Sequence, residues 1–125
     1  MKLRLLAGEL DTLKNDAGRH ILPVEERADT YQALQLGVAV IDSLLSDTFT
    51  VLADDGDLLQ VLSVVRNQAR GMNSSTCSVL PTMQLPLADR RGTLVSHNES
   101  MATRSTTLMA DIDRAIELLQ RHIPQ

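Results

Sequence analysis

The chain has 125 residues and a net charge of −4. Its length is sufficient for one domain, 1–125, with a hydrophobic core. Tyr31 and Phe49 are the only aromatic residues apart from histidine, so the chain lacks the stacking surface of single-strand nucleic-acid binders. The acidic pI of about 5.2 and the lack of a recognition-helix pattern also argue against nucleic acid as a partner.

A single cysteine, Cys77, excludes a disulfide within the chain and is typical of a reducing compartment. At the N-terminus, Glu9 and Asp11 interrupt the sequence before an apolar stretch long enough for a signal peptide. These features predict a cytoplasmic protein.

In chain order, the first predicted element is a helix over Lys2–Ala17. Four leucines recur there at 3-4-3 spacing, which places them on one face of a helix. Gly18 is expected to end this helix.

The segment Thr30–Ala53 carries only two charges and has apolar residues at almost every helical angle. We expect a second helix that starts near Pro23, runs to Ala53 and packs on two sides. Its second apolar stripe, which includes Val40 and Leu44, is expected to contact the rest of the chain or a second subunit. A homodimer is therefore predicted. The central Asp42 argues against a membrane span.

The run Asp54–Asp57 marks a turn, in which Gly56 suits the exit from one helix and Asp57 the N-cap of the next. A third helix over Leu58–Met72 is expected to form an antiparallel hairpin with the second. The acidic run does not match a calcium-binding loop, because its twelfth position is Val65 instead of glutamate.

Residues 73–97 contain Pro81, Pro86 and Gly92 and predict an irregular or hairpin-like arm. The last helix is expected to begin at Asn98 and to end before Pro124. The predicted fold class is therefore all-α: a four-helix, bundle-like domain centred on a long helical hairpin, with an arm at about 73–97.

The three histidines, His20, His97 and His122, have no Cys or His at metal-ligand spacing and are expected at the surface or at helix ends. His97 could act as a general base for Ser96 or Cys77, but nothing in the sequence orients these groups. No catalytic residue, metal site or cofactor site is predicted.

The middle of the chain is basic. Residues 60–105 contain five arginines against two acidic residues. Clustered guanidinium groups suit carboxylate or phosphate recognition. The residues predicted to bind a partner, from this region and from the second stripe of the long helix, are Val40, Leu44, Arg66, Arg70, Arg90 and Arg91.

These patterns predict a small non-enzymatic interaction module, such as an adaptor, an inhibitor or antiactivator, or a secretion-chaperone type regulator. In size, acidity and an amphipathic C-terminal helix, the chain is similar to bacterial type III secretion chaperones, although it lacks the several strands that such chaperones carry. The alternative is a small-ligand-binding protein or enzyme that uses Arg66, Arg70 and the 73–97 loop. A nucleic-acid-binding regulator is the third reading.

Overall fold

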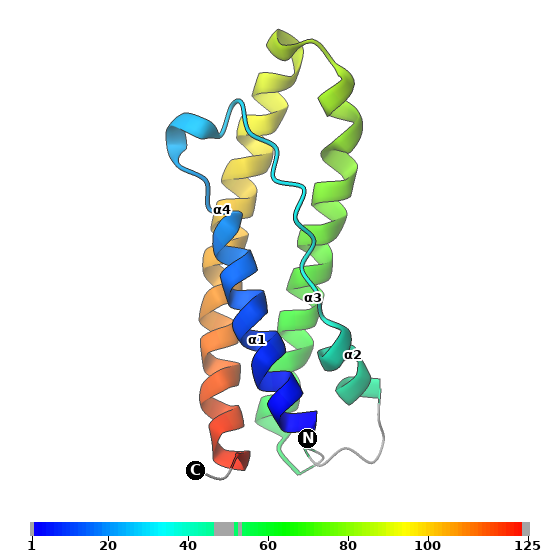
Figure 1. Ribbon diagram of the computed structural model, residues 1–125, viewed down its shortest axis with the longest axis vertical. Coiled ribbons are helices and arrows are strands. Elements are labelled where there is room, and N and C mark those ends of the chain that lie inside the picture. Colours follow the sequence, from blue (N-terminus) through cyan, green and yellow to red (C-terminus); the bar gives the residue numbers. More distant parts are fainter. Residues whose placement is uncertain (1, 47–51, 53, 124–125) are drawn as a thin grey trace.

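The computed structural model describes residues 2–46, 52 and 54–123, and these form an all-α bundle without strands (Figure 1). The four helices are α1 (Lys2–Arg19), α2 (Ala39–Ser46), α3 (Gly56–Val79) and α4 (Leu87–Leu119). Three short 3-10 turns are η1 (Val24–Glu26), η2 (Leu80–Gln84) and η3 (Gln120–His122). The predicted all-α, bundle-like fold class is confirmed.

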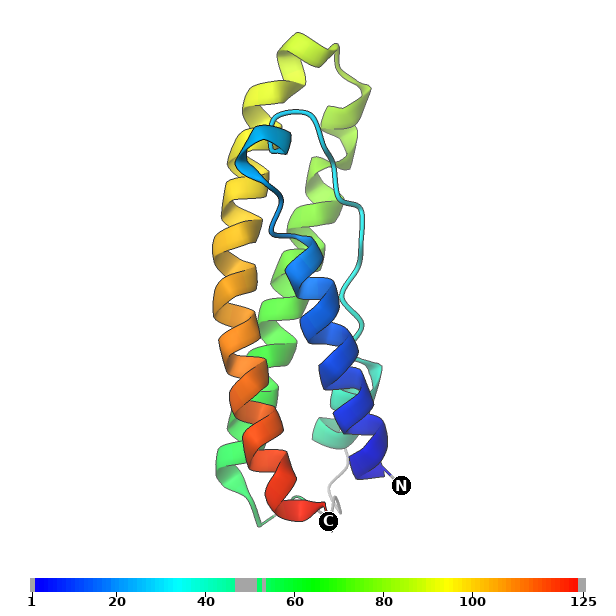
Figure 2. The ribbon, with the colours of Figure 1, turned by 60° about the vertical axis from the view of Figure 1, so that its left-hand side comes forward.

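An antiparallel hairpin of α3 and α4 runs the length of the molecule (Figure 1, Figure 2). With 33 residues, α4 is about 50 Å long. We call the end that carries residues 80–86 the turn end, and the opposite end, where α3 begins, the base. A helical hairpin does lie at the centre of the fold, but it joins α3 and α4, whereas the predicted hairpin joined the helices before and after Asp54–Asp57.

Both hairpin helices bury residues at alternating steps of three and four, the spacing of coiled-coil packing. On α3 these are Leu58, Leu62, Val65, Ala69, Met72, Thr76 and Val79, and on α4 they include Leu94, Asn98, Met101, Ser105, Leu108, Ile112, Ala115 and Leu119.

Helix α1 starts at the base and packs along α4. Its predicted span is confirmed, but Gly18 does not end it. No glycine among the described residues has a positive φ, and the helix continues to Arg19. A side chain at Gly18 would lie 3.8 Å from the Met109 Cε atom. Gly18 thus lies in the last turn of α1, facing Met109 of α4.

The predicted long helix over Thr30–Ala53 is wrong in its first half. Residues 30–38 are extended and run beside α3 in the opposite direction, and helix begins at Ala39 (Figure 1, Figure 2). Leu36 and Val38 are buried while Gln35 and Gly37 are exposed, which is the two-residue alternation of a strand. The end of the predicted helix, residues 47–51 and 53, lies outside the described residues.

The N-cap of α3 is Asp55, two residues before the predicted Asp57. The Asp55 side chain accepts a hydrogen bond from the Leu58 amide at 3.0 Å, which satisfies a backbone donor of the first turn. Gly56 is the first residue of the helix instead of the last residue of a preceding one. The role of Asp55 in this acidic run is therefore to cap α3.

The predicted arm at 73–97 is also wrong, because both hairpin helices extend through it. Pro81 and Pro86 lie in the short turn, where the missing amide costs little, and Gly92 lies inside α4. Asn98 is not an N-cap. It is buried in mid-helix, where its amide donates to the Arg27 and Thr30 carbonyls at 2.8 Å each.

The core changes character along the bundle. At the base the buried side chains are aliphatic. The described polar side chains that are buried lie between the middle of the bundle and the turn end, and they are His20, Thr76, His97, Asn98 and Ser105.

Candidate functional site

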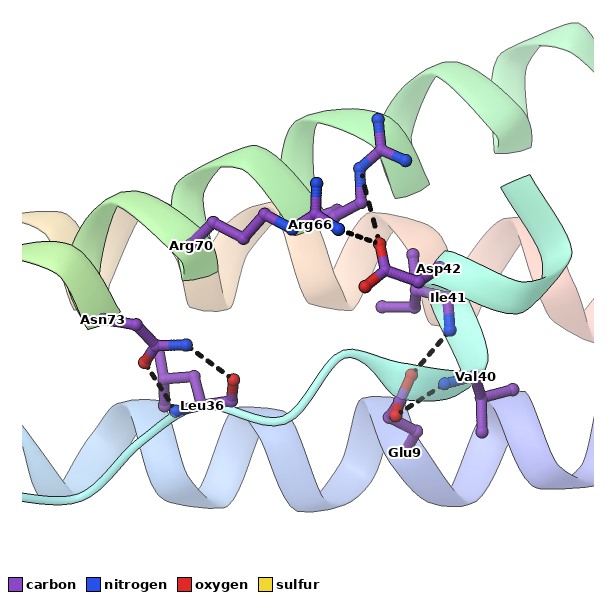
Figure 3. A network of polar contacts seen from close by, with 8 residues as sticks. All are labelled: Glu9, Leu36, Val40, Ile41, Asp42, Arg66, Arg70 and Asn73. Carbon is purple, nitrogen blue, oxygen red and sulfur yellow. Dashed lines mark hydrogen bonds and ion pairs between the residues drawn. The ribbon is translucent and has the colours of Figure 1, made fainter. Parts of the chain in front are cut away.

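The predicted basic pair on α3, Arg66 and Arg70, faces a carboxylate of the same chain (Figure 3). Arg70 Nη2 lies 2.7 Å from Asp42 Oδ1, and Arg66 Nε lies 3.8 Å from the same oxygen. Asp42 belongs to α2, so these ion pairs join α2 to α3. The two arginines are thus engaged within the chain.

Two further side chains bind the backbone near α2, one in the extended segment that precedes the helix and one at the start of the helix (Figure 3). Glu9 of α1 accepts hydrogen bonds from the Val40 and Ile41 amides at 3.0 and 2.8 Å, where the helix dipole favours negative charge. Asn73 of α3 binds both backbone groups of Leu36, accepting from its amide at 2.7 Å and donating to its carbonyl at 2.9 Å. The Asn73 side chain therefore satisfies the backbone N–H and C=O groups of Leu36, which a neighbouring strand would bind in a sheet.

The second stripe predicted for the long helix is largely covered by its own chain. Leu44 is 1% exposed and belongs to the core, and Val40 packs against that core while partly exposed. The apolar face that suggested a second subunit is therefore used inside the chain.

Arg90 and Arg91 lie near the turn end and also contact the chain itself. Arg90 Nη1 donates to the Met83 carbonyl at 2.9 Å, and Arg91 Nε lies 3.2 Å from Asp29 Oδ1. The first contact braces the turn between α3 and α4, and the second holds the 20–30 loop against α4.

Three exposed leucines lie in or next to the turn between α3 and α4. Leu80, Leu85 and Leu87 are 56%, 47% and 49% exposed, and we call these three residues the leucine tip. The sequence reading missed the cluster because it treated this stretch as an arm. Three leucines interleaved with Pro81 and Pro86 were the available signal.

His20 and His122 lie at helix ends, as expected, whereas His97 lies in the middle of α4. His20 and His97 are buried, and the His20 Nε2 atom lies 2.9 Å from the Leu34 carbonyl. His97 is 8% exposed, and its ring stands 6.4 Å from the Tyr31 ring. Neither nitrogen of the His97 ring has a hydrogen-bond partner among the described residues.

Burial lowers the pKa of both buried histidines, because the charged imidazolium is poorly solvated there. Electrostatic repulsion from His20 and Arg104 lowers the pKa of His97 further. For His20, the Leu34 carbonyl and Asp16 partly oppose the effect of burial. Both rings are therefore neutral at pH 7.

The third histidine, His122, closes the base of the bundle. Its Nε2 atom lies 2.7 Å from Asp55 Oδ2, which joins η3 to the start of α3. The hydrogen bond from His122, followed by that from the Leu58 amide, lowers the pKa of Asp55. This pair has a structural role at a helix end, as expected for a histidine near the end of the last helix.

An open groove lies between α3 and α4 below the leucine tip. We call it the hydroxyl groove: its volume is about 500 Å³, and its lining includes Ser75, Ser78, Thr93, Ser96, Ser100 and His97. Ser96 and His97 both line it, but consecutive helical residues do not face each other. Cys77 is exposed and is not among the lining residues. The geometry therefore does not assemble a base with either proposed nucleophile.

No known protein family, curated protein or solved structure matches the chain. In the described part of the chain, no group of three or more His, Cys, Asp or Glu side chains is arranged to hold a metal ion. Among the described helices, none combines the length and apolarity needed to cross a bilayer.

Proposed function

We propose that the protein is a non-enzymatic protein–protein interaction module, of the adaptor, inhibitor or chaperone type, that docks through its leucine tip. The observation that carries the proposal is the exposure of about half of each of three leucines within eight residues. Single exposed leucines are ordinary on protein surfaces, whereas a cluster of them marks a surface that another molecule covers.

The turn is braced for this role. Pro81 and Pro86 restrict its backbone, and Arg90 donates to the Met83 carbonyl across it. A surface that is ordered before binding loses less conformational entropy when a partner covers it. Arg90, predicted from sequence as a partner-binding residue, would then act by positioning the tip, whereas Arg91 holds the 20–30 loop.

The partner we propose is another protein with an apolar groove. A stable dimer interface draws on roughly 20–30 residues from each side. The turn between α3 and α4 is too short to supply that number against a second copy of itself. When a narrow tip enters a groove of another protein, the partner contacts it on several sides, so a few residues bury more apolar surface. We place this interaction in the cytoplasm, in keeping with the single Cys77.

The test compares two sets of surface substitutions. The triple variant Leu80→Ser, Leu85→Ser and Leu87→Ser changes the tip, and the control Leu5→Ser with Val64→Ser changes exposed apolar residues elsewhere. Both should fold, because exposed positions contribute little to stability. A partner captured from source cells and then purified should bind the triple variant at least about tenfold more weakly than the control.

A partner that binds both variants with equal affinity would overturn the docking surface. A second copy of the chain as the sole captured protein, with a doubled mass in light scattering, would replace the proposed partner with a homodimer.

A further inference from the structure

A second pocket lies between α3 and α4, nearer the middle of both helices than the hydroxyl groove. Its volume is about 230 Å³, and we call it the arginine pocket. Each helix contributes three lining residues: Asn67, Gln68 and Gly71 of α3, and Thr103, Arg104 and Thr107 of α4. The two helices thus bring together one cation, two amides and two hydroxyl groups, and none of the described residues that line the pocket is acidic.

Arg104 supplies the positive charge of the pocket. Its Nη1 atom donates to Ser75 Oγ at 2.6 Å, which holds the guanidinium group across the gap between α4 and α3. Gly71 keeps the space beside this group open, since even a Cβ atom there would lie 3.5 Å from Arg104 Nη2. Among the described residues, no carboxylate lies within 4 Å of the guanidinium. Its charge is therefore available to an anionic group.

Gln68 supplies a hydrogen-bond acceptor. Its Nε2 atom donates to Asp111 Oδ2 at 3.0 Å, which fixes the orientation of the amide, because the reverse orientation would place two oxygens together. The Gln68 Oε1 atom is buried and has no hydrogen-bond partner in the described structure. Buried carbonyl oxygens in native proteins nearly always accept a hydrogen bond. We expect the donor to enter from the pocket that Gln68 lines, and the neighbouring Asp111 carboxylate favours a donor with positive charge.

The two threonines add further acceptors. Thr103 Oγ1 donates to the Glu99 carbonyl at 3.2 Å, and Thr107 Oγ1 donates to the Thr103 carbonyl at 3.4 Å. Each hydroxyl has one proton, which is used in these contacts, but its oxygen can still accept. The pocket therefore offers donors from Arg104 and acceptors from Gln68 and the two threonines.

We propose that the arginine pocket binds a small free α-amino acid, with its carboxylate on the Arg104 guanidinium and its ammonium group on the acceptors. A guanidinium group pairs with a carboxylate through two parallel hydrogen bonds. An ammonium group has three donors and no acceptor, which matches Gln68 Oε1 and the threonine oxygens.

Charge and size narrow the class of ligand. One carboxylate balances the one cation of the pocket, whereas a phosphate group of charge about −2 would leave excess negative charge. The volume of about 230 Å³ favours an amino acid with a small side chain. The site shares no residue with the leucine tip, so it is separate from the proposed docking of a protein.

The test titrates the isotopically labelled protein with L-serine at constant neutral pH and ionic strength, followed by amide NMR signals. Gly71→Leu fills the pocket beside Arg104, and its matched control is Gly92→Leu, a helical position that lines the hydroxyl groove instead. Both replace a helical glycine with a better helix former, so both should fold. Arg104→Gln removes the charge, and Arg114→Gln, at an exposed position farther along α4, is its control.

In the natural protein and in both controls, we expect saturable shifts at the amides of Gly71 and Thr107. In Gly71→Leu and in Arg104→Gln, binding should weaken at least about tenfold, the loss expected when a charge-assisted hydrogen bond is removed. Shifts that do not saturate in the natural protein, or equal affinities in Gly71→Leu and Gly92→Leu, would overturn the proposal. Acetate that binds as tightly as L-serine would overturn the role of the ammonium group, and inorganic phosphate that binds more tightly would overturn the choice of a carboxylate.

Discussion

The base and the turn end of the same helical hairpin are built in different ways. At the base, α1, α3 and α4 bury aliphatic side chains, among them Leu10, Leu62 and Ile112, which are all fully buried. From mid-bundle to the turn end, the same heptad positions hold Thr76, Asn98 and Ser105. The difference teaches that the purely aliphatic part of the core lies at one end of this bundle and the buried polar side chains lie toward the other.

The largest expected effect comes from shortening a buried side chain at the base. Leu62→Ala removes a fully buried side chain and leaves a cavity, and it should lower the free energy of unfolding by about 2–5 kcal/mol. Urea denaturation measures this. Ser105→Ala is the control from the polar part: its buried hydroxyl has no hydrogen-bond partner in the described structure, so we expect a change within about 0.5 kcal/mol. Equal losses for both variants would contradict the comparison.

A smaller effect is expected from Asn73→Ala, between the two ends. It removes both hydrogen bonds to the Leu36 backbone and should cost about 1–3 kcal/mol. Amide hydrogen exchange should become faster at Leu36 while the amides of α3 near the base stay protected. Asn67→Ala, at an exposed position on the same helix, is the matched control. Unchanged exchange at Leu36 would show that other contacts hold the extended segment.

The smallest expected effect is a pH dependence of the free energy of unfolding that arises from the buried histidines, His20 and His97. The pKa values of His20 and His97 lie below the usual 6.5, so the unfolded chain takes up protons just below pH 6.5 that the folded chain does not. The free energy of unfolding should therefore be highest above pH 6.5 and fall as the pH is lowered. Urea denaturation at a series of pH values measures the slope, and His97→Gln should flatten it.

Asp55 affects the stability in a lower range of pH. Its pKa lies below the usual 3.8, so its contribution is present above that pH and is lost only in stronger acid. Asp55→Asn should therefore flatten the acid limb; because it also removes the partner of His122, the slope just below pH 6.5 is compared between His97→Gln and the natural protein instead. A slope that survives His97→Gln in full would assign it to other groups.

The sequence predicts helix type and the long amphipathic stripes well, because 3-4 spacing of leucines has few alternatives. It misplaces residues 30–38 because the chain satisfies two patterns there. Leu34 and Val38 fall on one helical stripe and Leu36 on a second, but all three also alternate with Gln35 and Gly37 as in a strand. The observed conformation is held by residues far away in the sequence: Asn73 binds the extended backbone at Leu36, and Glu9 binds the first amides of α2 that follow it.

The groove and the leucine tip were missed for a different reason. Polar residues and prolines between residues 73 and 98 read locally as loop, since Ser, Thr and Asn have weak helix propensity. Packing of α3 against α4 overrides that preference. Whether a serine on such a helix faces a neighbour, solvent or an open groove depends on the helix crossing, which spacing alone does not encode.

The extended segment over residues 30–38 has a consequence for the order of folding. The α3–α4 hairpin joins neighbours in sequence through one short turn, and such local contacts form quickly. Residues 30–38 make no hydrogen-bonded ladder, and their place depends on side chains such as Asn73 that the hairpin must first present. We therefore expect residues 30–38 to dock only after the hairpin has formed and to open before it unfolds.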